Sequence, residues 1–286
     1  MGERDRSSAS AETPPLSPSH VTGRRHGLSR PSRAERKAPF AMTTFKIIAC
    51  GTVRDEVEAL RGDIPVEYLE GFLHDTPNVL RSTINERIAA TPGAQTILLA
   101  YGRCSNGTAR LVAGPHRLVL PASDDCIALL LGSQRAYKRE FAEHPGTYYY
   151  TRGWIEELED PYREYLKMIP RMGEEKARMV AHMILEAYTR VAIIDTGTYD
   201  LVKAQEYVDT VAEFYGLPIH KIAGSLRLLE KLIRGPHDEE FIVVEPGEVL
   251  EEKIFWDLGA AEPAPETPPN PRGVLSGEPE LDACPG

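Results

Sequence analysis

The sequence lacks a long apolar run, a dense set of cysteines and a surplus of basic residues. The longest dense apolar run covers only residues 127–131, far short of the roughly 20 residues of a membrane-spanning helix, so we expect no membrane association. Four cysteines in 286 residues, with no secretory segment ahead of them, do not form the pattern of a disulfide scaffold. A net charge of −10 argues against nucleic acid as a partner, because binding phosphates requires clustered Lys and Arg. These absences predict a soluble cytoplasmic protein with reduced thiols.

What the sequence does contain is an ordinary globular composition, 42% hydrophobic and 27% charged, between two segments of a different kind. Residues 1–41 are rich in Ser, Pro, Arg and Ala without apolar periodicity, which predicts a disordered N-terminal tail. One alternative is that translation starts at Met42. Another is a transit peptide, although the acidic residues of this segment argue against it. Residues 259–286 are rich in proline and predict a second disordered tail, which holds Cys284.

Between the tails, short β-rich runs alternate with helical stretches. The predicted strands lie at residues 45–49, 66–72, 96–101, 117–120, 191–194, 219–222 and 241–244. This alternation predicts an α/β fold with two doubly wound, Rossmann-like lobes, whose mainly parallel sheets are covered by helices. A break near residues 161–173 divides the chain into a first lobe at 42–160 and a second at 161–258, with a loop and helical segment predicted over 147–167.

Three cysteines stand just after predicted strands. Cys50 directly follows the first strand, Cys104 lies in the loop after the third, and Cys126 begins the helix after the fourth. Because ligands of doubly wound sheets bind at the carboxyl ends of the strands, we expect these thiols to share one crevice. A helix N-terminus also favours the thiolate, which binds metals. Cysteine is also a common core residue, so the same placement can arise by chance.

These cysteines are candidate metal ligands. Their spacing is not the paired Cys-x-x-Cys of a zinc ribbon or finger. Three remote thiolates with an open fourth position nevertheless form a ligand set for zinc or for an iron–sulfur cluster. We therefore predict a metal site at Cys50, Cys104 and Cys126, with His74 and His116 as candidates to complete it, although a lone histidine is more often an ordinary surface or core residue.

Other candidate ligand-binding residues lie in the same loops. Asn106 belongs to a Gly-flanked loop over 102–107, which resembles a phosphate-binding turn but lacks the Gly-x-Gly-x-x-Gly and Walker spacings. Asp125 directly precedes Cys126. We therefore expect both side chains to make polar contacts with a small-molecule ligand in the crevice formed by the cysteines.

Two further groups of candidates lie later in the chain. Asp195 and Thr196 follow a predicted strand, where they could face a ligand, although capping of the next helix is the simpler explanation. Tyr149 and Trp154 belong to an aromatic segment over 145–154, whose composition is typical of a pocket or an interface. A segment that covers the edge of a sheet has the same composition, and this alternative stays open.

One combination of motifs resembles a known family. The motifs are Ala49-Cys50-Gly51, Tyr101-Gly102-x-Cys104-x-Asn106-Gly107, Asp125-Cys126 with Leu130-x-Gly132-Ser133, and Pro145-Gly146-Thr147-Tyr148-Tyr149 with Gly153-Trp154. Over about residues 45–245 they are similar to an uncharacterised prokaryotic family, the domain of unknown function numbered 1638. Genes of that family often lie near genes of corrinoid-dependent methyltransferases. The resemblance therefore implies a methyl-transfer or one-carbon context, with a corrinoid protein or methyltransferase as partner.

These observations leave two hypotheses. The first is a metalloprotein, with enzymatic activity left open, whose three thiolates bind zinc or an iron–sulfur cluster. The alternative is a non-enzymatic accessory protein or a small-ligand binding protein without metal.

Overall fold

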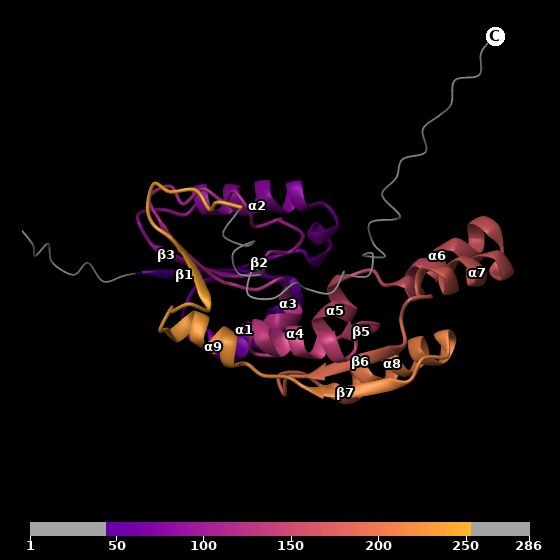
Figure 1. The fold of residues 1–286 in the computed structure, drawn as a ribbon. Helices are drawn as coiled ribbons and strands as arrows, with labels where there is room; N and C mark the ends of the chain where they lie inside the picture. Colours follow the sequence, from indigo (N-terminus) through magenta and orange to yellow (C-terminus); the bar gives the residue numbers. More distant parts are fainter. Residues whose placement is uncertain (1–43, 253–286) are drawn as a thin grey trace, which may run out of the picture. The chain divides into compact units, whose positions relative to one another are not determined.

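The structure is a computed structural model that describes residues 44–252. The predicted tails at 1–41 and 259–286 lie outside the described residues, and so does Cys284. The described chain combines helices with two mostly parallel sheets, which confirms the predicted α/β fold class (Figure 1).

The first sheet has five strands in the order β2-β1-β3-β4-β8. Its strands are β1 (Phe45–Cys50), β2 (Val66–Leu69), β3 (Thr96–Ala100), β4 (Arg117–Pro121) and β8 (Phe241–Val244). The first four run parallel, and β8 pairs antiparallel with β4. All five residues of β3 are buried, as expected for a central strand with helices on both faces.

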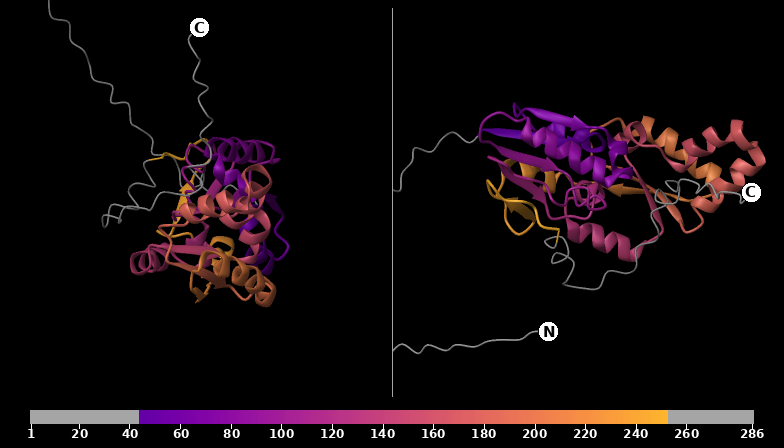
Figure 2. Two further views of the ribbon diagram at one scale, coloured as in Figure 1. Left: turned by 90° about the vertical axis from the view of Figure 1, so that its right-hand side faces the viewer. Right: turned by 90° about the horizontal axis from the view of Figure 1, so that it is seen from above.

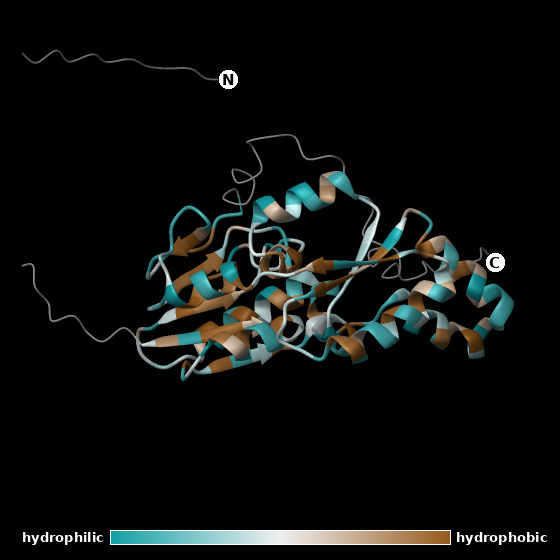
Figure 3. Cartoon of the chain, turned by 90° about the horizontal axis from the view of Figure 1, so that it is seen from below, coloured by the Kyte–Doolittle hydropathy of each residue, from teal (hydrophilic) through white to brown (hydrophobic). Residues whose placement is uncertain are grey.

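Amphipathic helices cover this sheet. Figure 1 shows α2 (Pro77–Ala89) on one face and α1 (Arg54–Leu60) with α9 (Arg227–Arg234) on the other. The inward side of α2 carries Leu80, Ile84 and Ile88 at four-residue spacing, which forms one apolar stripe. In Figure 3 the strands are coloured mainly as hydrophobic, while the helices alternate between hydrophobic and hydrophilic.

The second sheet has three parallel strands in the order β5-β6-β7. They are β5 (Thr147–Tyr150), β6 (Arg190–Asp195) and β7 (Ile219–Ala223). The prediction of a loop at the start of 147–167 was wrong, because Thr147–Tyr150 is a strand paired with β6. Threonine and tyrosine both favour strands.

Helices also pack against the second sheet and connect the two sheets. They are α3 (Cys126–Leu130), α4 (Gln134–Glu143), α5 (Arg152–Glu157), α6 (Pro161–Met172), α7 (Glu174–Ile184) and α8 (Leu201–Tyr215). Helices α6 and α7 contact one another along their length, and Figure 2 shows this pair from two further sides. No helix within 44–252 has both the length and the apolar character needed to cross a membrane.

The two sheets share part of one apolar core. Ala192 and Ile194 of β6 belong to the same buried cluster as the strands of the first sheet. Strand β5 lies in the predicted first lobe but pairs in the second sheet, and β8 lies in the predicted second lobe but pairs in the first. The division into two lobes is therefore not confirmed.

Candidate functional site

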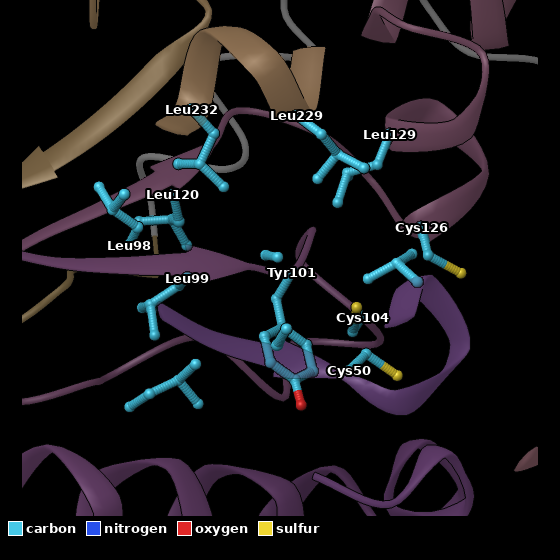
Figure 4. Close-up of a cluster of buried hydrophobic side chains, with 14 of the residues drawn as sticks. Cys50, Leu98, Leu99, Tyr101, Cys104, Leu120, Cys126, Leu129, Leu229 and Leu232 are labelled. Carbon is cyan, nitrogen blue, oxygen red and sulfur yellow. The ribbon is translucent and has the colours of Figure 1, made fainter. Parts of the chain in front are cut away.

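The three predicted cysteines lie together at the carboxyl ends of neighbouring parallel strands. Cys50 is the last residue of β1, Cys104 lies in the loop after β3, and Cys126 is the first residue of α3 after β4. Their exposed fractions are only 1%, 4% and 5%. In Figure 4 the side chains of Cys50 and Cys104 are drawn nearer to the ring of Tyr101 than that of Cys126. We refer to Cys50, Cys104 and Cys126 as the thiol cluster.

The loop that carries Cys104 has an unusual backbone. Cys104, Ser105 and Asn106 have φ angles of 47°, 54° and 65°, three consecutive left-handed residues without a glycine among them. Each such residue costs of order 1–3 kcal/mol and persists only where the surroundings impose it. Backbone strain of this kind clusters at ligand and active sites, which makes this loop the strongest local indication of a functional site.

The neighbouring loop after β4 imposes this backbone. The amides of Arg103 and Cys104 donate to the carbonyls of Ser123 and Asp124, at 2.7 and 2.9 Å. Gly102 makes this pairing possible, because a Cβ at this position would lie 2.7 Å from the Asp125 nitrogen. The close approach of the two loops is what brings Cys104 next to Cys126.

Two thiols of the cluster accept hydrogen bonds. The Thr52 hydroxyl donates to Cys50 Sγ at 3.1 Å, and the indole N–H of Trp154 donates to Cys126 Sγ at 3.3 Å. Trp154 reaches the cluster because α5 lies against the 3-10 helix η2 (Gly51–Val53), where Gly153 leaves no room for a Cβ beside the Thr52 carbonyl. Donors directed at sulfur favour the thiolate form.

The electrostatic surroundings of the cluster are acidic. Burial raises the pKa of Cys104 well above its usual value, and the nearby Cys126, Cys50 and Asp125 raise it further. Burial also raises the pKa of Asp125 to about 6, against the opposing effect of its hydrogen bond from the Ile127 amide. Without a cation, the thiol of Cys104 stays protonated at neutral pH.

Two residues beside the cluster were missed from sequence. Tyr101 follows β3 directly, and the strand-end reasoning that selected the cysteines applied to it as well. Glu157 lies in helix α5, and nothing in the sequence around it indicated a place beside the cysteines. Its carboxylate accepts a hydrogen bond from the Gly71 amide at 3.4 Å, lies 3.8 Å from Arg54, and occupies the space that a Cβ on Gly51 would need.

Three other predicted ligand-binding residues, Asn106, Asp125 and Tyr149, have structural contacts. The Asn106 carbonyl accepts from Arg81 Nη2 at 2.7 Å, and Asp125 caps α3 through the Ile127 amide at 2.9 Å. Tyr149 is 8% exposed and packs in the shared core, and burial raises its pKa to about 12.

Asp195 and Thr196 contact side chains of the protein itself. Asp195 forms an ion pair with Lys221 at 2.8 Å. The Thr196 hydroxyl donates to Glu56 Oε1 at 2.7 Å, and Thr198 donates to the same oxygen at 3.1 Å. Burial raises the pKa of Glu56, which is 2% exposed. These two hydroxyls therefore satisfy a buried carboxylate.

A metal site is not formed by the side chains as they stand. Across residues 44–252, no three His, Cys, Asp or Glu side chains are arranged to hold one ion. His116 accepts from the Gln95 amide, which precedes β3 and so lies at the opposite end of the strands from the thiols. His74 Nδ1 lies 2.6 Å from the Gly71 carbonyl, with its ring 6.4 Å from that of Tyr101. Coordination by the three thiols would require their side chains to turn.

The fold and this cluster define an α/β protein with buried thiols collected at strand ends. The sequence model of a family described as "Protein of unknown function (DUF1638)" matches residues 68–233, which is more than half of the chain. The chain therefore belongs to this family, and the resemblance seen in the sequence is confirmed. The matched segment holds Cys104 and Cys126 and begins after Cys50. No curated protein and no solved structure matches the chain.

Proposed function

We propose that the thiol cluster binds a thiophilic metal, either a zinc ion or an iron–sulfur cluster. The observation that carries the proposal is the burial of three thiols at adjacent strand ends, where the carboxyl group of Asp125 also raises the pKa of Cys104. An ionised Cys126, Cys50 or Asp125 would raise the pKa of Cys104, because a negative charge beside this thiol disfavours its thiolate form. A bound cation would remove this repulsion and allow the thiols to ionise.

The strained loop supports the same proposal. Three left-handed residues at Cys104–Asn106 are unfavourable in the metal-free protein and need a compensating interaction. Metal–thiolate bonds of roughly 2.3 Å would supply one, provided that the thiols turn toward a common centre. The hydrogen bonds from Thr52 and Trp154 would then orient two coordinating sulfurs.

The packing around the thiols favours a single ion over a cluster. The Glu157 carboxylate lies where a Cβ on Gly51 would be, only 2.5 Å away, and a Cβ on Gly153 would lie 2.1 Å from the Thr52 carbonyl. A four-iron cluster with its sulfides would have to displace these contacts, whereas one zinc ion needs little space. We therefore take zinc as the leading candidate and the iron–sulfur cluster as the second.

Three protein ligands leave one coordination position open, which is the arrangement of catalytic zinc. An ion held in this way can polarise a substrate oxygen or activate a substrate thiol for methyl transfer. Participation in corrinoid-linked methyl transfer or one-carbon metabolism stays a prediction, and so does a corrinoid protein or methyltransferase as partner.

Metal analysis of anaerobically purified protein tests the proposal. We expect about one zinc per chain, or visible absorption if an iron–sulfur cluster is present. The variant with Cys50, Cys104 and Cys126 all changed to Ala should lose the metal, while Cys284→Ala should keep it. Wild-type protein without zinc or iron, or equal metal contents in wild type and triple variant, would refute the proposal.

The alternative is an accessory or small-ligand binding protein without metal. It is favoured by one observation, that no three potential ligands within 44–252 are arranged around a common centre. The aromatic segment is a poor anchor for a partner, because Tyr148, Tyr149 and Tyr150 are all buried. Thermal-shift screening of the metal-free protein against nucleotides and organic acids tests this alternative, and an absence of hits would count against it.

A further inference from the structure

Helix α7 turns small apolar residues inward and larger ones toward solvent. Ala177 and Ala181 on its inner side are fully buried, whereas Met179 and Met183 are 61% and 67% exposed. At about 100° per residue, the two methionines lie on the side of the helix opposite the alanines. An amphipathic helix that packs only on its own chain keeps its large apolar side chains toward the core. The outer side of α7 therefore has the composition of a contact surface.

The exposed residues of α7 follow the spacing of a coiled coil. Lys176, Met179, Met183 and Glu186 stand at intervals of three, four and three residues, the last of them just beyond the end of the helix. This spacing forms one stripe along a helix, in which every member takes an a or d position of a heptad. All four side chains are exposed. We refer to these four residues as the α7 stripe.

The α7 stripe is complementary to itself. Ala181 is the midpoint both between Met179 and Met183 and between Lys176 and Glu186. A twofold axis at this midpoint would pair α7 with an antiparallel second copy, in which every residue meets its counterpart on the other side of the midpoint. Each methionine then packs on the other methionine of the second copy, and each lysine meets a glutamate. This is the pairing of a and d positions found in antiparallel coiled coils.

A hollow in the surface lies at the glutamate end of the α7 stripe. It has a volume of about 180 Å³, and Glu186, Tyr188 and Tyr215 are among the residues that line it. A carboxylate beside aromatic side chains attracts an ammonium group. Within the described chain neither Lys176 nor Glu186 forms an ion pair with another residue. The hollow therefore suits the lysine that the twofold pairing places there.

We propose that the chain forms a twofold-symmetric homodimer through the α7 stripe, with the two α7 helices antiparallel. The proposal goes beyond the metal function and does not depend on it. Only two layers of methionine lie at the centre of this contact, so the buried area is at the low end for a specific interface. We expect a reversible dimer with a dissociation constant between about 1 μM and 1 mM.

Sedimentation equilibrium of the full chain tests the proposal, because it reports molecular mass independently of shape. The wild-type protein is measured at concentrations up to about 1 mM, the upper limit of the expected dissociation constant. The average mass should rise with concentration from that of one chain toward that of two. A mass of one chain at every concentration would overturn the proposal and leave this face to a partner of another kind.

Two substitutions at the centre of the stripe test which face associates. The double variant Met179→Ser with Met183→Ser should weaken association at least about tenfold, because the dimer then buries much less apolar surface. The matched control is Val202→Ser, since Val202 is 68% exposed but lies near the start of α8. It is about 20 Å along that helix from Tyr215. The control should associate as wild type does, and unchanged association of the double methionine variant would overturn the proposal.

Charge reversal tests the antiparallel pairing itself. Lys176→Glu and Glu186→Lys, made singly, each place like charges opposite one another at two symmetric positions, and each should weaken association about tenfold at roughly 0.1 M salt. The chain that carries both substitutions regains opposite charges at both positions. Its dissociation constant should return to within about threefold of the wild-type value, because the two changes are coupled only across the twofold axis. A combined variant as weak as either single variant would overturn the proposal.

Discussion

Gly102 holds the two cysteine loops in contact, and Gly102→Ala tests whether that contact organises the site. The new Cβ would lie 2.7 Å from the Asp125 nitrogen, 2.8 Å from its Cα and 3.0 Å from the Asp124 carbonyl carbon. All three are backbone atoms, so no side chain can rotate away to relieve the clash. The loops must separate until the contact reaches an ordinary distance of at least 3.4 Å. Cys104 then moves away from Cys126.

The cost follows from this forced separation. Overpacking of a tight site costs typically 1–3 kcal/mol, and we expect the free energy of unfolding of Gly102→Ala to fall by about 2 kcal/mol. For a chain of this size, that is a fall of roughly 4–8 °C in melting temperature. The measurement is urea unfolding followed by circular dichroism. The slope of the unfolding free energy against urea concentration should be the same for both proteins, so that a lower midpoint reports lower stability. Zinc affinity should fall as well, because two of its ligands have been moved apart.

Gly197→Ala is the control for this substitution. Gly197 has a φ of +73° and nothing within 4 Å of a Cβ, so alanine there brings backbone strain without a clash. We expect it to lose about 1 kcal/mol and to retain its metal. If Gly102→Ala unfolds at the wild-type free energy, the two loops are not held rigidly together. The account of how Cys104 is positioned would then be wrong.

Three further predictions concern the metal and a buried carboxylate. In a Trp256→Phe background, zinc should change the fluorescence of Trp154, whose indole donates to Cys126; an unchanged emission spectrum at saturating zinc would contradict this contact. Zinc affinity should rise at least about tenfold per pH unit near neutrality, because the raised pKa of Cys104 means that binding displaces a proton; a flat profile in isothermal titration calorimetry would count against it. The raised pKa of Glu56 means that its favourable contribution is present below its unfolded pKa and is lost as pH rises through the folded value. Glu56→Gln should therefore gain stability relative to wild type between pH 4 and pH 7 in urea unfolding, and a constant difference would refute this.

Much of the fold was predictable because strand and helix patterns are local. After Thr96 the run at 96–100 is apolar, and it forms the fully buried central strand. The prediction of a loop and helical segment at 147–150, a threonine followed by three tyrosines, was wrong. The strand there depends on pairing with β6, which comes some forty residues later. Pairing between strands distant in sequence leaves little trace in a short window.

The sequence by itself determined that three cysteines end up at one edge of a parallel sheet, because that follows from their places after strands β1, β3 and β4. Only the tertiary structure decided which side chains surround them. Glu157 reaches Gly71 from 86 positions away, and Thr196 bonds Glu56 from 140 positions away. Such contacts depend on how helices and loops pack against the sheets, whereas strand-end placement depends only on the alternation of elements along the chain.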